Sequence, residues 1–217
     1  MPRIKICGIT NLNDAKLAQR LGADIEGFIF AESPRRITPE KAALIIKKLK
    51  PGVLKAGVFV DEKAQTVNNI IKKLRLNMVQ LHGDEPVSYL RQIKGAMIVK
   101  VISVKNTADL KRQVKKYEKN VDAFLFDTYS KSARGGTGQC FDWKMLKGIK
   151  FSKPFFVAGG INPENVCRAI KEAKPYGVDV SSGVEKEKGK KSPAKLKKLF
   201  KEIQGLDKAA KLKAKRP

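Results

Sequence analysis

The sequence predicts a single (β/α)₈ barrel. Eight short runs rich in Val, Ile and Phe recur along the 217 residues and are nearly continuous in apolar character, as strands buried on both faces are. Amphipathic stretches separate most of these runs, which favours parallel strands joined by right-handed crossovers. Eight such units close naturally into a barrel. A doubly wound open sheet is the alternative, but its GxGxxG fingerprint is missing after the first strand, where the sequence reads Cys7-Gly-Ile-Thr10.

The element boundaries follow from these patterns. The predicted strands are 4–7, 26–30, 54–60, 78–81, 97–102, 123–127, 155–158 and 178–180. The predicted helices are 14–21, one starting at 38, 62–74, 85–93, 107–119, a short piece at 141–146, and two starting at 162 and 192.

Residues typical of helix ends support these helices. Gly22 is a typical C-terminal cap. Thr38-Pro39-Glu40 combines an N-cap, a proline in the first turn and an early acid, and Asn162-Pro-Glu164 and Ser192-Pro193 repeat the first two features. We therefore expect helices to begin at each of these three places.

The chain is strongly basic, with a formal net charge of +25. Residues 186–217 hold 13 Lys and Arg against three acidic residues and supply +10 of that charge. Arg and aromatic residues do not cluster there, so we interpret the charge as a lysine-rich solvated surface, with nucleic-acid binding as the less favoured alternative. We predict a catalytic domain over residues 1–205 and a frayed basic tail over 206–217.

Cysteine use and hydropathy indicate the cellular setting. The three cysteines are widely spaced and form no CxxC, and the chain has one histidine, so neither structural zinc nor a disulfide framework is expected. No apolar run reaches the ~18 residues of a membrane span, and the N-terminus runs directly into a strand without room for a signal peptide. We predict a cytoplasmic enzyme with reduced thiols and without a metal, a cofactor, a membrane partner or a nucleic-acid partner.

Two strand ends carry groups suited to proton transfer. Cys7 ends the first predicted strand and Asp127 the sixth, and catalytic groups in such barrels lie at the C-terminal ends of strands. An isolated cysteine is usually a small buried apolar residue, but a position at a strand end before Gly8 suggests more. Asp179 ends the eighth strand beside the first, so Lys5 and Asp179 are expected to pair.

Three glycine-rich turns follow late strands and predict a phosphate site. Such turns expose backbone N–H groups that surround an anion, and barrels often hold phosphate in the loops after strands seven and eight. Ordinary tight turns are the alternative. The residues predicted to bind phosphate are Gly136, Gly138, Gly159, Gly160, Ser181, Ser182 and Gly183.

Two further side chains are candidates for substrate binding. Arg36 follows the second strand, and its guanidinium can hold a carboxylate bidentately, although a solvated loop arginine fits the spacing equally well. His82 follows the fourth strand, where a lone histidine is more often a structural hydrogen-bonding residue than a base. We assign Arg36, His82 and Asp179 to substrate binding.

The motifs together resemble the phosphoribosylanthranilate isomerase family. The resemblance runs from residue 3 to about 191 and rests on Lys5-Ile-Cys-Gly-Ile-Thr10, Gln80-Leu-His-Gly83, Phe126-Asp-Thr128, Gly135-Gly-Thr-Gly138, Ala158-Gly-Gly160, Asn162-Pro-Glu-Asn-Val166 and Asp179-Val-Ser-Ser-Gly-Val-Glu185. It implies a barrel enzyme of tryptophan biosynthesis, a monomer or homodimer, that acts on a small anionic phosphosugar by a cofactor-free Amadori rearrangement. By motif, Asp127 is then the general acid, Cys7 the general base and Arg36 the ligand of the anthranilate carboxylate.

These roles raise a difficulty of protonation. At ordinary pKa values of about 3.9 for Asp and 8.5 for Cys, both groups are in the wrong form near neutrality. We expect desolvation and the anionic substrate to raise the pKa of Asp127, and cationic surroundings such as Lys5 to favour thiolate at Cys7.

Two other phosphosugar barrels fit the sequence less well. Indole-glycerol-phosphate synthase needs a lysine and glutamate cluster at strand ends, which is not found. The sugar-phosphate isomerase of histidine synthesis uses two aspartates, whereas the first strand here ends in Cys7.

Overall fold

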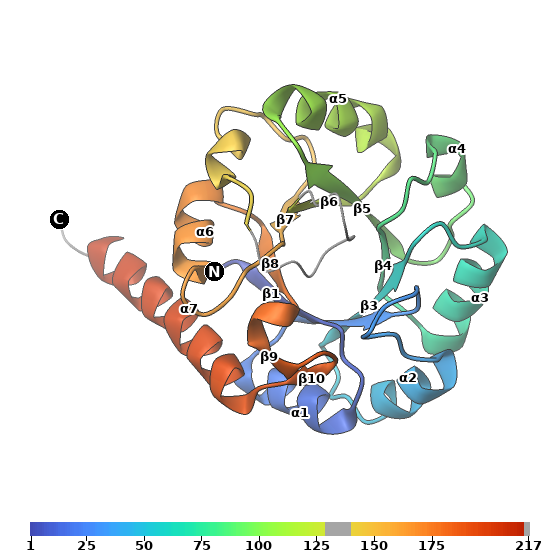
Figure 1. The fold of residues 1–217 in the computed structure, drawn as a ribbon, viewed down its shortest axis with the longest axis horizontal. Coiled ribbons are helices and arrows are strands. Elements are labelled where there is room, and N and C mark those ends of the chain that lie inside the picture. The colour runs from blue at the N-terminus through green and yellow to red at the C-terminus, as the bar shows by residue number, and fades with distance from the viewer. Residues whose placement is uncertain (129–139, 215–217) are drawn as a thin grey trace.

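The structure is a computed structural model that describes residues 1–128 and 140–214, with side chains described as far as residue 206. Eight parallel strands close into a barrel in sequence order (Figure 1). They are β1 (Arg3–Cys7), β2 (Ile25–Ile29), β3 (Leu54–Phe59), β4 (Met78–Leu81), β5 (Met97–Val104), β6 (Ala123–Thr128), β7 (Phe155–Val157) and β8 (Gly177–Val180). The predicted fold class and all eight predicted strands are confirmed.

Helices form a ring outside the strands (Figure 1). They are α1 (Leu12–Leu21), α2 (Pro39–Ile46), α3 (Ala64–Leu74), α4 (Val87–Leu90), α5 (Thr107–Tyr117), α6 (Val166–Ala173) and α7 (Pro193–Ala214), with 3-10 turns η1 (Glu118–Asn120), η2 (Trp143–Leu146) and η3 (Ser182–Val184). No helix in the described ranges is long and apolar enough to cross a membrane.

Most predicted helix ends are confirmed. The Thr38 side chain accepts a hydrogen bond from the amide of Lys41 at 3.3 Å, and α2 begins at the next residue, Pro39. Gly22 closes α1 in the left-handed region at φ 109°, which a residue with a Cβ adopts only at a cost. Helix α1 begins two residues earlier than predicted because Asn11, not a later residue, supplies the cap.

Further helix predictions differ from the structure; the short helix expected at 141–146, for example, is the 3-10 turn η2. Helix α6 begins at Val166, not after Asn162, because the Asn162 side chain accepts from the amides of Glu164 and Asn165 and closes a separate turn. Helix α4 is a single turn, not 85–93. Helix α7 continues to Ala214, so the predicted boundary at residue 205 falls inside a helix, and the backbone of residues 206–214 is helical instead of frayed.

A small hairpin after β8 was not predicted. Strands β9 (Glu185–Glu187) and β10 (Lys190–Lys191) pair antiparallel beside β1 and α1 (Figure 1). The segment has a charged sequence typical of an exposed loop, which is why its periodicity gave no strand signal. The hairpin contacts α1 directly, since the amide of Lys191 donates to Asp14 at 2.8 Å.

Side chains of the strands alternate between the barrel interior and the layer beneath the helices. Along β1, Ile4 and Ile6 belong to the apolar core beneath the helices, whereas Lys5 and Cys7 face the interior. A second, smaller apolar cluster fills the interior below the site and includes Ile25, Met78, Val99 and Leu125 among its residues. The C-terminal ends of the strands are therefore held between two packed layers.

Candidate active site

One cavity of about 410 Å³ opens at the C-terminal ends of the strands. Cys7 from β1, Asp127 from β6, Asp179 from β8 and His82 after β4 all line it. Residues far apart along the chain therefore converge on one space, as the sequence predicted. Parallel strands in a closed barrel end at the same rim, which is the physical reason for this convergence.

The predicted pair of Lys5 and Asp179 is confirmed beneath the cavity. The Lys5 ammonium donates to Asp179 at 2.8 Å and to Gln80 at 2.7 Å. Burial lowers the pKa of Lys5, but Asp179 and Cys7 outweigh that effect, so the pKa of Lys5 is raised and the ammonium stays charged. The second Asp179 oxygen, Oδ1, is buried without a hydrogen-bond partner in the described part of the chain.

Cys7 is a buried free thiol at the end of β1. Gly27 on the neighbouring strand makes room for it, since a Cβ there would lie 2.7 Å from the Cys7 sulfur. Burial raises the pKa of the Cys7 thiol, whereas the charges of Lys5 and Lys191 lower it by smaller amounts and Asp179 raises it further. The expected effect of Lys5 is confirmed, since its charge favours the thiolate, but the expected net decrease in the pKa of Cys7 is wrong, because desolvation is the larger effect.

Asp127 is almost completely buried at the end of β6. Burial raises its pKa to about 6; the backbone amide of Thr128 and the Lys5 charge act against this, and Asp179 adds to it. The predicted increase by desolvation is confirmed. His82 Nε2 lies 3.5 Å from Asp127 Oδ2, so the lone histidine stands beside the predicted acid.

Two of the predicted phosphate turns reach the cavity. Gly159 and Gly160 line it at φ 76° and 67°, in the left-handed region that favours glycine. Ser181 and Ser182 also line it, and the Ser181 hydroxyl oxygen is buried without a hydrogen-bond partner among the described residues. Gly183 does not line the cavity and packs against the carbonyl of Ile161, where a Cβ would collide. Gly136 and Gly138 lie outside the described residues.

The two neighbouring arginines have different surroundings. Arg36 is not among the residues that line the cavity; its side chain is 60% exposed and its guanidinium lies 3.4 Å from Glu32, which does line it. Arg35 lines the cavity and donates two hydrogen bonds of 2.8 Å to Glu185. The structure therefore does not place Arg36 in the cavity wall, and its exposed ion pair with Glu32 contributes little to stability.

Sequence reasoning missed four polar residues around the cavity. Gln80 holds Lys5, and Arg35 is linked through Glu185 to Lys191, whose ammonium donates to the carbonyl of Cys7. Gln80 and Glu185 stand inside the motifs that carry the family resemblance, which was a usable signal. Lys191 gave none, since it is one of many lysines in a basic segment.

Known proteins resemble the chain along nearly its whole length. A family model described as N-(5'-phosphoribosyl)anthranilate (PRA) isomerase matches residues 4–202. The N-(5'-phosphoribosyl)anthranilate isomerase of Caldanaerobacter subterraneus is 43% identical over 206 residues, which is 95% of this chain and 100% of that protein. That of Desulforudis audaxviator is 45% identical over 201 residues, 93% of this chain and 97% of the relative.

Solved structures of phosphoribosyl anthranilate isomerases also resemble the chain. Phosphoribosyl anthranilate isomerase from Thermotoga maritima superposes with a TM-score of 0.87 at 39% identity, covering 94% of this chain and 100% of that one. A phosphoribosyl anthranilate isomerase in complex with reduced 1-(o-carboxyphenylamino)-1-deoxyribulose 5-phosphate has a TM-score of 0.84 at the same identity and coverage. The chain belongs to the N-(5'-phosphoribosyl)anthranilate isomerase family.

Proposed function

We propose that the chain converts N-(5'-phosphoribosyl)anthranilate to 1-(2-carboxyphenylamino)-1-deoxyribulose 5-phosphate by general acid–base catalysis, with Asp127 as the acid and Cys7 as the base. The observation that carries this assignment is that both groups line one cavity at the strand ends. A family structure that holds the reduced product supports the choice of substrate. The reaction is an aldose–ketose isomerisation, for which we propose no cofactor.

The first step opens the sugar ring. Protonated Asp127 gives its proton to the furanose ring oxygen, the bond from C1 to that oxygen breaks, and the anthranilate nitrogen lone pair forms a Schiff-base cation with C1. Burial supports this role, because a pKa of about 6 leaves about one Asp127 in ten protonated at pH 7, against about one in a thousand at the ordinary value.

The second step removes the proton from C2. Cys7 takes it, and the electron pair of the C2–H bond flows toward the cation to give an enolamine, which becomes the ketone. Asp127 has lost one proton and Cys7 has gained one, so a proton must pass back before the next turnover. The cation also makes C2 more acidic, so a thiol that is seldom ionised can serve as base.

Substrate binding divides between two sides of the cavity. We assign the phosphate to the backbone N–H groups of the turns at Gly159, Gly160, Ser181 and Ser182, together with Gly136 and Gly138. The free oxygen of Asp179 is suited to accept a hydrogen bond from a sugar hydroxyl, and His82 stands beside Asp127 to contact the same substrate. We assign the anthranilate carboxylate to Arg36, which must leave Glu32 to reach it.

This activity places the protein in tryptophan biosynthesis, with a small anionic phosphosugar as its partner and the cytoplasm as its proposed location. Oligomeric state stays a prediction of monomer or homodimer; a solved relative from Thermotoga maritima is described as dimeric.

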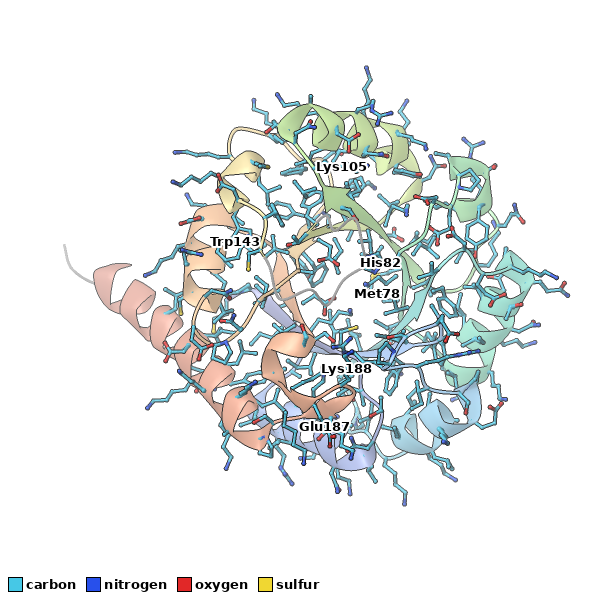
Figure 2. The ribbon with its side chains drawn as sticks, viewed as in Figure 1. Met78, His82, Lys105, Trp143, Glu187 and Lys188 are labelled. Atoms are coloured by element: carbon cyan, nitrogen blue, oxygen red, sulfur yellow. The ribbon has the colours of Figure 1, made fainter. Side chains whose placement is uncertain are left out.

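A nucleic-acid role remains the less favoured alternative, because nitrogen-tipped side chains project all round the ring of helices in Figure 2 instead of forming one stripe.

The anthranilate fluorescence assay with freshly made N-(5'-phosphoribosyl)anthranilate tests these roles. Asp127→Asn and Cys7→Ala should each lower kcat by about 10²–10⁴-fold with little change in KM, the range expected for one acid–base group. Glu202→Gln, an exposed carboxyl on α7, is the control that should match wild type. Near-normal kcat in Cys7→Ala would remove the base assignment, and the same result in Asp127→Asn would remove the acid.

A further inference from the structure

Lys191 is a buried lysine that the proposed chemistry does not use. Its ammonium donates to three acceptors: the Cys7 carbonyl at 2.6 Å, the Ser181 carbonyl at 3.1 Å and Glu185 Oε1 at 3.1 Å. The side chain has no solvent exposure. Burial lowers the pKa of Lys191, and the Glu185 carboxylate opposes that effect. Three acceptors around the nitrogen require all three protons of an ammonium, so this geometry favours the charged form of Lys191.

The three acceptors belong to different parts of the site. Cys7 ends β1, Ser181 follows β8, and Glu185 begins the β9–β10 hairpin and holds Arg35 of the loop after β2. One side chain therefore joins the strand end that carries the base to the turn assigned to the phosphate. The carbonyl that it holds on β1 belongs to the residue whose thiol faces the cavity.

The local charge balance is also uneven. Lys5 and Asp179 form one cation and one anion, whereas Arg35, Glu185 and Lys191 form two cations around one anion. Counted alone, the second group has one positive charge in excess next to the Cys7 backbone; the Asp14 carboxyl group also lies beside it, since it accepts from the Lys191 amide at 2.8 Å. A buried ammonium is costly unless acceptors satisfy its protons, and the three acceptors of Lys191 meet that requirement.

We infer that Lys191 is a positioning residue for the isomerisation: it fixes the Cys7 strand end against the Ser181 turn and keeps a positive charge behind the base. This inference rests on the proposed role of Cys7. It also adds to that role, because Lys191 would hold Cys7 at a fixed position relative to the turn that we assign to the phosphate. The hairpin that carries Lys191 becomes part of the catalytic apparatus and not only a surface connection.

Several charged groups besides Lys191 act on the pKa of the Cys7 thiol. The charged groups that act on the Cys7 thiol are Lys5 on β1, Asp179 on β8, Lys191 on β10 and Arg35 in the loop after β2, while Asp127 and His82 line the same cavity. Lys191 is one of the groups that lower the pKa of Cys7 against the dominant effect of burial. Its loss should therefore make the thiolate scarcer.

Lys191→Met tests the inference, with Lys190→Met as the matched control, since Lys190 is 61% exposed and pairs only with Glu187 among the described contacts. We expect kcat at pH 7 to fall between about tenfold and 10²-fold in Lys191→Met, the scale of a small misplacement of a reacting group. The alkaline limb of the pH profile should move to higher pH. The pH midpoint of iodoacetamide reaction at Cys7, followed by mass spectrometry, should move in the same direction. Lys190→Met should match wild type in all three.

Lys191→Gln keeps amide donors without the charge and carries the test if Lys191→Met fails to fold. It should retain more kcat than the methionine variant but show the same shift of the Cys7 midpoint. A folded variant of either kind with wild-type kcat and an unmoved midpoint overturns the inference. That result differs from failure of the proposed function, which appears as an active Cys7→Ala enzyme.

Discussion

Two buried carboxyl groups, one in the barrel wall and one at the barrel mouth, differ in what surrounds them. Glu26 on β2 is opposite Ile6 and has 0% exposure, and both of its carboxyl oxygens lack a hydrogen-bond partner in the described chain. Burial raises its pKa to about 8. Asp127 is similarly buried, but its pKa reaches only about 6, because the Thr128 amide and the Lys5 charge favour its ionised form.

Glu26 and Asp127 show that burial of a carboxyl group does not by itself make it suitable for catalysis. Burial alone keeps a carboxyl protonated at neutral pH, as at Glu26, but that carboxyl faces the layer beneath the helices and no ligand reaches it. Asp127 lines the cavity, and its polar neighbours hold its pKa close to neutrality, where an acid can both give and regain a proton. Access to the cavity, together with a few polar contacts, is what makes a buried carboxyl useful.

Among the effects that test this comparison of Glu26 with Asp127, the largest is expected on stability and comes from Glu26. The folded protein holds this proton more tightly than the unfolded chain, so stability is lost as pH rises from about 4.5 to about 8. Between pH 6 and pH 9 the loss should be on the order of 3 kcal/mol, roughly a hundredfold in the unfolding equilibrium. Urea unfolding should show that Glu26→Gln removes this part of the slope and that Glu202→Gln does not. Parallel wild-type and Glu26→Gln slopes would mean that Glu26 finds a partner in solution.

The next effect is on the pH profile of activity. In the proposed mechanism, Asp127 and Cys7 together hold one proton, so kcat/KM should fall about tenfold per pH unit below about 6, where both groups become protonated. It should stay level up to the raised pKa of Cys7 and fall above it. Glu26→Gln should leave this profile unchanged, with no limb near 8. An acid limb that persists in Asp127→Asn belongs to the substrate and not to Asp127.

A substitution next to Cys7, the proposed base, should reduce turnover without removing any polar group. Gly27→Ala places a methyl 2.7 Å from the Cys7 sulfur, so the thiol must move. We expect kcat to fall between about tenfold and 10²-fold while the fold survives. Gly205→Ala, where nothing lies within 4 Å, is the control for a glycine-to-alanine change. Wild-type kcat in Gly27→Ala would show that the position of Cys7 is not demanding.

The smallest expected effect is on substrate affinity. Arg36→Ala should raise KM by about tenfold with little change in kcat, which is the scale of one lost charge-assisted hydrogen bond. Arg112→Ala removes another exposed arginine, which pairs with Asp109 on α5, and should change neither constant. Equal KM in Arg36→Ala and wild type would move the carboxylate site to another residue, and Arg35 would be the next to test.

The amino-acid sequence alone was sufficient to predict the barrel, the order of its strands and the convergence of Cys7 and Asp127, the two residues that we propose as base and acid. Apolar runs and helix caps are local signals, and a closed parallel barrel brings every strand end to one rim, so Cys7, Asp127 and Asp179 could be placed together before any coordinates. Local signals also misplaced some boundaries, as at Asn162, whose side chain closes a turn before the helix instead of capping it.

The pKa values and contacts of the buried charged groups became known only from the three-dimensional arrangement of the chain. Three findings depend on distances between residues remote in sequence. Lys5 does not overcome desolvation at Cys7, Glu26 has no hydrogen-bond partner among the described residues, and Lys191 is the one lysine of its segment with a described side chain that reaches the strand ends. A pKa is set by the solvent excluded and the charges gathered around a group. Neither quantity has a counterpart in the order of residues along the chain.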